Sequence, residues 1–200
     1  VAALCRVLDP SARATSTLAE LRLRSCGLTD AAGAALMRAL TDNTTLTVLD
    51  LADNECGVET ARAMRAAAET NDALGYVDLS RNRIDFAAAE AVAASIRATE
   101  SLEFLSLARN GLGDDACATI AEALAMDGTL RELDLCATRA GPKAARATAS
   151  ALRANGTLER LFLDGNPLGE EGCASILAAE KSEGNRTRVS MRGCRYASAE

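Results

Sequence analysis

Cysteines are the residues of this chain with the widest chemical repertoire, so their spacing is considered first. The seven are Cys5, Cys26, Cys56, Cys117, Cys136, Cys173 and Cys194. The chain has no histidine, which excludes a Cys–His nucleophile, and it has no C-x-x-C pair with the close spacing of a zinc site. An odd number of scattered cysteines argues against a secreted disulfide framework. We therefore expect reduced thiols and a cytoplasmic location.

Two tandem pairs of carboxylates, Asp114-Asp115 and Glu170-Glu171, are the other groups with potential catalytic or ligand chemistry. Both pairs lie where helices are expected to start, and an acidic side chain there caps free N–H groups and complements the helix dipole. The chain has neither the alternating acidic residues of a calcium loop nor a glycine-rich phosphate loop. The sequence therefore predicts no catalytic residues, no metal site and no cofactor, and we expect a protein that is not an enzyme.

The charge balance narrows the choice of partners. The net charge is −6 and the isoelectric point about 4.9, without the basic stripe that nucleic-acid binding requires. The apolar stretches are interrupted by charged residues and fall short of the roughly 20 residues that span a membrane. No signal-peptide pattern is visible. We expect a protein partner, with no nucleic acid and no membrane insertion, and the acidic body favours a basic partner.

A repeat of 28 residues organises the chain. Its six copies begin at Leu18, Leu46, Leu74, Leu102, Leu130 and Leu158. When each of these leucines is counted as position 0, apolar residues recur at positions 3 and 5, which is the two-residue period of a β-strand. The second half of each copy has a helical period, and "DAAGAALMRAL" (30–40) places Leu36, Met37 and Leu40 on one face. Single aspartates near the expected helix starts fit N-terminal caps: Asp30, Asp85 and Asp114.

Position 8 carries asparagine in four of the six copies and a thiol or hydroxyl in the other two. A partial seventh copy, which begins at Arg186, has a thiol at this position. The residues are Cys26, Asn54, Asn82, Asn110, Thr138, Asn166 and Cys194. At this point the backbone leaves the strand and turns inward, so its N–H and C=O groups would be buried without a strand partner. An asparagine side chain offers both an amide donor and a carbonyl acceptor. We therefore predict a structural role for this position, for the two cysteines as well.

Four segments, "LTVLDLADNEC", "LGYVDLSRNRI", "LEFLSLARNGL" and "LERLFLDGNPL", carry the pattern L-x-x-L-x-L-x-x-N/C-x-L. This pattern resembles the leucine-rich repeat family, and the 28-residue period with helical second halves resembles its ribonuclease-inhibitor-like class. The resemblance implies an α/β, right-handed solenoid shaped like a horseshoe, with a parallel sheet on the concave face and helices on the convex face. It also implies that the side chains at position 8 stack into a ladder, in which cysteine and threonine substitute weakly for asparagine.

The repeat predicts a single leucine-rich repeat domain over residues 1–200. Residues 1–17 read as the helical half of an earlier repeat, 18–185 hold six repeats, and 186–200 add a last strand and a tail. A solenoid needs terminal layers with a polar outer face, and neither end shows one. We therefore expect a longer chain, in which flanking sequence or another chain covers the ends.

Positions 2, 4 and 6 of each copy point away from the core, toward the concave face. These positions hold three of the five tyrosine and phenylalanine residues of the chain. We predict that a partner binds at Val48, Asp50, Tyr76, Asp78, Phe104, Asp134 and Phe162. An aromatic column with an acidic rim is typical of a protein-binding surface. The convex helices, the two ends and a flanking domain are the alternative sites.

The leading hypothesis for function is a non-catalytic protein–protein interaction module or scaffold that binds mainly through the concave face. Two alternatives stay open. One is a GTPase-activating protein of the Ran-activator type, which shares the fold that the resemblance implies, although no residue set here matches that activity. The other is a structural subunit of a large ciliary or cytoskeletal assembly, because fold alone does not choose a function.

Overall fold

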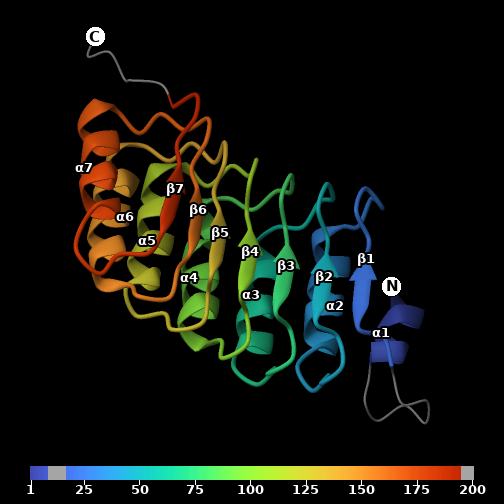
Figure 1. Cartoon of the computed structure of the whole chain (residues 1–200). Helices are drawn as coiled ribbons and strands as arrows, with labels where there is room; N and C mark the ends of the chain where they lie inside the picture. Colours follow the sequence, from blue (N-terminus) through green and yellow to red (C-terminus); the bar gives the residue numbers. More distant parts are fainter. Residues whose placement is uncertain (9–16, 195–200) are drawn as a thin grey trace.

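The computed structural model describes residues 1–8 and 17–194, in which helices and strands alternate along the chain (Figure 1). The strands are β1 (Glu20–Arg22), β2 (Val48–Asp50), β3 (Tyr76–Asp78), β4 (Phe104–Ser106), β5 (Glu132–Asp134), β6 (Arg160–Phe162) and β7 (Arg188–Ser190). The helices are α1 (Ala2–Leu8), α2 (Asp30–Ala39), α3 (Val58–Ala68), the 3-10 turn η1 (Phe86–Ala88), α4 (Ala89–Ala98), α5 (Gly113–Leu124), α6 (Pro142–Ala154) and α7 (Glu170–Glu180). Parts of the expected N-terminal half-repeat (9–16) and C-terminal tail (195–200) lie outside the described residues.

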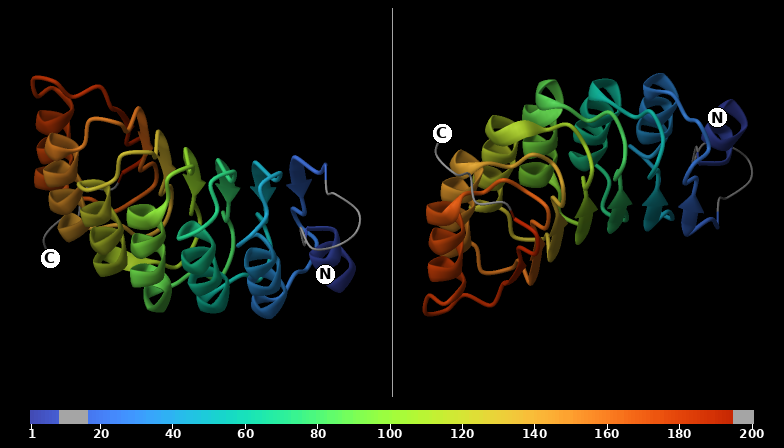
Figure 2. Two further views of the ribbon diagram at one scale, coloured as in Figure 1. Left: turned by 90° about the horizontal axis from the view of Figure 1, so that it is seen from below. Right: turned by 90° about the horizontal axis from the view of Figure 1, so that it is seen from above.

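The strands form one open parallel sheet in the order β1 to β7. Each strand residue pairs with the residue 28 positions later in the next strand, so Leu21, Leu49 and Val77 lie in one row. The helices lie on one side of the sheet, and the strands form the inner row of the arc (Figure 2). The first and last strands, β1 and β7, lie at opposite ends of the array (Figure 1). The structure confirms the predicted right-handed α/β solenoid with its sheet on the concave face.

The core lies between the sheet and the helices and uses the predicted apolar positions. Leu36 from a helix and Leu49 from a strand are 0% exposed, and burial of one such side chain stabilises the fold by about 1.5–3 kcal/mol. A Cβ atom on Gly33 would lie 2.5 Å from Oγ1 of Thr60 and 2.7 Å from Sγ of Cys56, so neighbouring helices approach this closely only with glycine here. None of the helices in the described ranges is long and apolar enough to cross a membrane.

The turn after each strand uses a residue in the left-handed backbone region at position 7. These residues are Ser25, Asp53, Arg81, Arg109, Ala137, Gly165 and Gly193, with φ between 54° and 72°. A side chain other than glycine is sterically disfavoured in this region, by roughly 1 kcal/mol. Because only two of the seven residues are glycine, the sequence carries no turn signal at position 7, and this turn was not predicted.

Asparagine side chains at position 8 join consecutive repeats. The amide oxygen of Asn54 accepts hydrogen bonds from the backbone N–H groups of Cys26 at 3.1 Å and Leu28 at 2.9 Å. Its amide nitrogen donates to the carbonyls of Leu23 and Leu51, both at 2.9 Å. The same bridging between two repeats recurs at Asn82, Asn110 and Asn166. Each asparagine therefore satisfies buried backbone groups of two repeats at once.

The three other residues at position 8 make fewer bonds between repeats. The hydroxyl of Thr138 donates to the carbonyl of Leu135 in its own repeat at 2.7 Å, and it meets the preceding repeat at the thiol of Cys117, 3.4 Å away. Cys26 is exposed in the turn after β1, where its thiol bonds to a carbonyl of its own repeat. The thiol of Cys194 lies 3.3 Å from a carbonyl of the preceding repeat. Because β1 is the first strand in the described ranges, the thiol of Cys26 makes no bond to a preceding strand.

A second ladder, which the sequence analysis missed, lies at position 25, after each of the helices α2 to α6. Its members are Asn43, Asn71, Thr99, Asp127 and Asn155. The amide nitrogen of Asn71 donates to the carbonyls of Leu40 and Asn43, both at 2.6 Å, and its oxygen accepts from the N–H of Leu74 at 2.8 Å. Asp127 accepts the equivalent N–H bond at 2.9 Å but has no amide to donate to the preceding repeat. It is 7% exposed, and this burial raises the pKa of its carboxyl group.

The aspartates at the helix starts cap helices in two different ways. Asp85 caps its own turn, because its carboxylate accepts from the N–H of Ala87 at 2.9 Å. Asp30 instead accepts from the N–H groups of Gly57 at 2.7 Å and Thr60 at 2.8 Å, at the start of the next helix, α3. Asp114 caps α6 in the same way. The sequence predicted capping by these residues, and the structure shows that two of them cap the helix of the following repeat.

Removal of one asparagine from the first ladder should destabilise the fold. Asn110→Ala would leave the carbonyls of Leu79 and Leu107 and the N–H of Ile84 without their side-chain partner. We expect a loss of about 1–3 kcal/mol in the free energy of unfolding, measured by urea denaturation. Cys26→Ala is the control and should change that free energy by less than about 0.5 kcal/mol. Equal unfolding midpoints for the two variants would contradict a role of the ladder in stability.

Asp127→Asn should stabilise the protein in a pH-dependent way. By equivalence with Asn155, the new amide would donate to the carbonyls of Ile96 and Thr99. Burial raises the pKa of Asp127 in the folded protein. The contribution of Asp127 to the free energy of unfolding is therefore fully present below the ordinary carboxyl pKa, and it is lost as the pH rises through the pKa of the folded state. We expect a gain of about 1 kcal/mol at neutral pH that shrinks as the pH falls toward 3, measured by urea denaturation across this range. A gain that does not change with pH would contradict the assignment of an ionised, buried carboxylate.

Candidate functional site

A pair of aromatic rings occupies the centre of the concave face. Tyr76 of β3 and Phe104 of β4 are direct neighbours in the register of the sheet. Their ring centroids lie 4.1 Å apart and their planes differ by 3°, so the rings are stacked. Val48 precedes Tyr76 in the same row, and all three side chains are half-buried. The structure therefore brings three of the predicted partner-binding residues into one apolar strip across β2, β3 and β4.

A charged groove lies beside this strip. It has a volume of about 590 Å³ and is lined by Tyr76 and Phe104 together with charged side chains of the following repeats. Its ion pairs join Arg131 to Glu159 at 2.9 Å, Arg131 to Glu103 at 3.8 Å, and Arg160 to Glu132. Most of these side chains are more than half exposed, so the pairs contribute little to stability. They place both signs of charge around an apolar floor, which is the usual composition of a binding surface.

Asp50 and Asp78 do not form the acidic rim that the sequence predicted. They are 6% and 5% exposed, and each accepts a hydrogen bond at 2.9 Å from a backbone N–H of the turn that follows its strand, at Ala52 and Ser80. Arg24 bridges the two carboxylates, with contacts of 3.3 Å to Asp50 and 2.7 Å to Asp78. The strand alternation placed both residues on the correct face, but the turn backbone and Arg24 cover them.

The last two predicted residues lie on β5 and β6. Asp134 accepts hydrogen bonds from the N–H of Cys136 at 2.9 Å and from Oγ of Ser106 at 3.3 Å. Phe162 is the register neighbour of Asp134 and is half-buried. It lies two strands away from Phe104 and in a different row, so it does not join the aromatic stack. The concave face thus has one aromatic centre and one separate ring nearer the C-terminal end.

The thiols of Cys136 and Cys117 are poorly suited to nucleophilic chemistry. Burial, reinforced by the neighbouring carboxylate of Asp134, raises the pKa of Cys136 to about 12. Burial likewise raises the pKa of Cys117 to about 11. A thiol must be ionised to act as a nucleophile or a metal ligand, and these values keep both side chains protonated at neutral pH. In the part of the chain that the structure describes, no three histidine, cysteine or acidic side chains are grouped to hold a metal ion.

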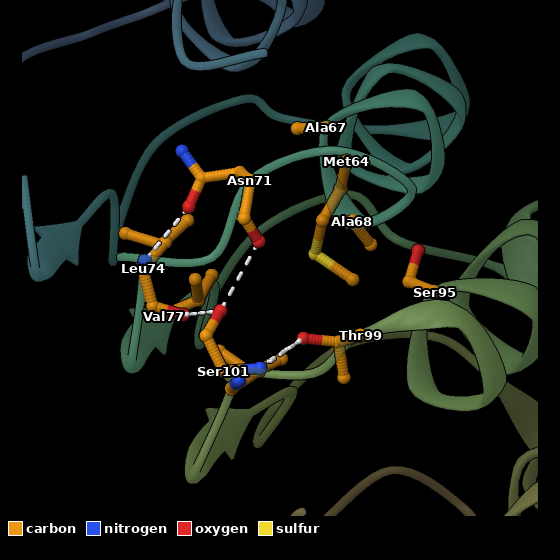
Figure 3. Close-up of a pocket in the computed structure, with 10 residues that line it drawn as sticks. Met64, Ala67, Ala68, Asn71, Leu74, Val77, Ser95, Thr99 and Ser101 are labelled. Atoms are coloured by element: carbon orange, nitrogen blue, oxygen red, sulfur yellow. Dashed lines mark hydrogen bonds between the residues drawn. The ribbon is translucent and has the colours of Figure 1, made fainter. Parts of the chain in front are cut away.

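A small hollow lies in the interior between the second and third repeats (Figure 3). Its volume is about 20 Å³, and its wall includes Met64, Asn71, Thr99 and Ser101. Thr99 occupies position 25, where the neighbouring repeats have the longer side chains of Asn71 and Asp127, and its smaller side chain leaves room for the hollow. A cavity of this volume accommodates one water molecule, so we do not regard it as a ligand site.

The architecture and the ladders together define the class of the protein. One short strand and one helix in each 28-residue unit, with asparagine at the strand end, make an α/β repeat solenoid. The chain contains leucine-rich repeats, since the family model described as leucine-rich repeat matches residues 16–37, 42–59 and 100–121. No curated protein matches the sequence.

Solved structures with the same fold include a domain of leiomodin-1 and a domain of tropomodulin. Leiomodin-1 actin-binding site 2 has a TM-score of 0.56 and 19% sequence identity, over 66% of this chain and 74% of that one. The tropomodulin C-terminal domain from Caenorhabditis elegans has a TM-score of 0.60 and 17% identity, over 74% of this chain and 88% of that one. At these identities the likeness shows the shared fold and leaves the function to be argued from the surface.

Arg24→Ala should destabilise the N-terminal part of the concave face. The substitution would leave Asp50 and Asp78 as buried neighbours of like charge without the cation that bridges them. We expect a loss on the order of 1 kcal/mol in the free energy of unfolding. Arg22→Ala is the matched control, because Arg22 pairs with exposed Glu20 on its own strand, and it should be neutral. If the two variants unfold at the same urea concentration, Arg24 does not hold the two carboxylates in place.

Proposed function

We propose that this protein is a non-catalytic protein-binding module that recognises a protein partner through its concave face. The observation that carries the proposal is the stacked pair of Tyr76 and Phe104, which lies on the outward side of the sheet rather than in the core. Large rings in a half-buried, outward position contribute less to folding than core residues do. At the centre of an interface, the same side chains supply apolar area and a defined shape.

The stack is pre-organised for binding. Because each ring holds the other in one orientation, a partner that covers them loses less side-chain freedom than it would by ordering two mobile rings. The Tyr76 hydroxyl adds a polar group at the same place. Burial, together with the carboxylates of Asp78 and Asp50, raises the pKa of Tyr76, so the hydroxyl stays a neutral hydrogen-bond donor at physiological pH.

The surrounding charges favour a basic group on the partner. The groove carboxylates Glu103, Glu132 and Glu159 are already paired with arginines. Asp134 is half-buried and bonds to a backbone N–H and a serine hydroxyl, with no ion pair among the described residues. A lysine or arginine of the partner would therefore find its counter-charge at Asp134, close to the apolar strip.

The setting that we propose is cytoplasmic and connected with the cytoskeleton. Leiomodin-1, one of the proteins with the same fold, is described by an actin-binding site. The uniform 28-residue repeats with a helix in each second half support the ribonuclease-inhibitor-like class within the leucine-rich repeat family. An actin-like or other cytoskeletal protein is therefore the first partner to test.

Loss of the aromatic pair should weaken partner binding while the fold stays intact. The double variant Tyr76→Ala/Phe104→Ala removes the centre of the surface, and truncation of a central aromatic residue costs at least about 2 kcal/mol, roughly 30-fold in affinity. The affinity of wild type and variant for actin, and for any protein captured from a cell extract on immobilised wild type, is measured by isothermal titration calorimetry. Circular dichroism melts verify that both proteins are folded.

Met126→Ala is the matched control for loss of an exposed apolar side chain, because Met126 is 81% exposed and follows α5, away from the strands. We expect it to bind like wild type. A partner that binds the double variant as tightly as wild type would rule out the concave face as the site.

A further inference from the structure

A second surface lies at the edge of the solenoid where the strands end and the helices begin. We call it the arginine rim and define it as Arg81, Arg109, Arg139 and Phe86. The three arginines are exposed, and Phe86 is 74% exposed, an unusual degree for a large apolar side chain. None of these residues belongs to the outward strand positions that form the concave face.

Backbone contacts place the members of the arginine rim side by side. The N–H of Arg81 donates to the carbonyl of Ala108 at 2.8 Å, so Arg81 and Arg109 are neighbours in adjacent repeats, at the strand spacing of about 4.8 Å. The N–H of Gly113 donates to the carbonyl of Thr138 at 2.9 Å, which brings the start of α5 next to Arg139.

Phe86 joins the same edge through the pairing of the residue before it. Asp85 forms a β-bridge with Gly111, so Phe86 lies beside the segment that leads into α5. A Cβ atom added to Gly111 or Gly113 would meet nothing within 4 Å. The surface at these two glycines, between the segment of Phe86 and that of Arg139, is therefore open to a ligand.

The acidic side chains near this edge already have partners, whereas the arginines of the rim form no ion pair with the described residues. Glu55 forms an ion pair with Arg83 at 2.9 Å, and Asp115 forms one with Lys143 at 2.6 Å. Asp114 is held by three N–H groups of α6, Asp85 by the N–H of Ala87, and Asp53 by the hydroxyl of Ser25. Within the described residues, the three arginines of the rim form no ion pair with any carboxylate. Two of them lie side by side although like charges repel, and an anionic ligand would relieve that repulsion.

We propose that the arginine rim is a second interaction surface, which binds an acidic peptide segment of a partner protein. Carboxylates of the segment pair with Arg81, Arg109 and Arg139, since guanidinium groups bind carboxylates in a two-pronged geometry. An apolar side chain of the segment covers Phe86, and the open glycine edge lets the peptide backbone approach. The preference for acidic ligands is opposite to that proposed for Asp134 on the concave face, so the protein would bind two different ligands at once.

The test measures binding of a short fluorescein-labelled peptide of glutamates around one phenylalanine, by fluorescence anisotropy. The rim variant is Arg81→Gln/Arg109→Gln/Arg139→Gln. Loss of three exposed ion pairs should weaken the affinity on the order of tenfold, and the salt dependence of binding should become shallower. Phe86→Ser should weaken binding separately.

The matched control is Arg38→Gln/Arg62→Gln/Arg146→Gln, which changes the net charge equally at three exposed arginines of the convex helices α2, α3 and α6 that form no ion pair with another described residue. It should bind the peptide within about twofold of wild type, as should Tyr76→Ala/Phe104→Ala, which keeps this test independent of the concave face. Equal losses in the rim and control variants would overturn the proposal, and so would wild type that fails to bind the peptide. It would also be overturned if a single-stranded oligonucleotide bound the rim more tightly than the glutamate peptide, since that result would assign the rim to nucleic acid.

Discussion

The structure depends on one constraint, which is that stacked repeats bury backbone polar groups at two turns in every 28 residues. A strand of three residues cannot provide partners for the N–H and C=O groups of these turns, and leaving them unpaired would cost about 1–3 kcal/mol each. Asn54 and its equivalents resolve this at the end of each strand, and Asn71 and its equivalents do so after each helix. Each asparagine bonds to two repeats, so the same interaction that satisfies the backbone also fixes the spacing between neighbours.

That constraint also explains which features the sequence predicted. Leucine at positions 0, 3 and 5 and asparagine at position 8 recur without insertion, so the period, the strands and the first ladder could be read directly. The second ladder could not, because Asn71, Thr99 and Asp127 are also ordinary residues for a turn after a helix. That Asp30 caps α3 could not be predicted for a related reason, since a sequence shows that an aspartate lies near a helix start and does not show which helix it will face.

The sequence predicted on which face of the sheet the residues of the candidate site lie, but not how far each side chain is exposed. Alternation along a strand places Tyr76, Asp78 and Phe104 correctly on the concave side. It does not report how deeply each side chain is covered, which depends on neighbours in other repeats. Asp78 is buried because the N–H of Ser80 and the guanidinium group of Arg24, from a strand two repeats away, both reach its carboxylate. The aromatic stack required the pairing of β3 with β4, which the repeat period did provide.

The two proposed surfaces differ in the charge that they favour, and the net charge of −6 does not prevent this. Seven strands at about 4.8 Å per step give a sheet nearly 30 Å wide, whereas charges are screened over about 8 Å at physiological ionic strength. A ligand therefore responds to the groups within one or two repeats of where it binds. At the strand ends of repeats three to five these groups are three arginines that pair with no carboxylate in the described part of the chain, and on the concave face near Phe162 they include Asp134. A repeat fold makes such separation simple, because a surface residue contacts only its neighbours and can change without disturbing a distant surface.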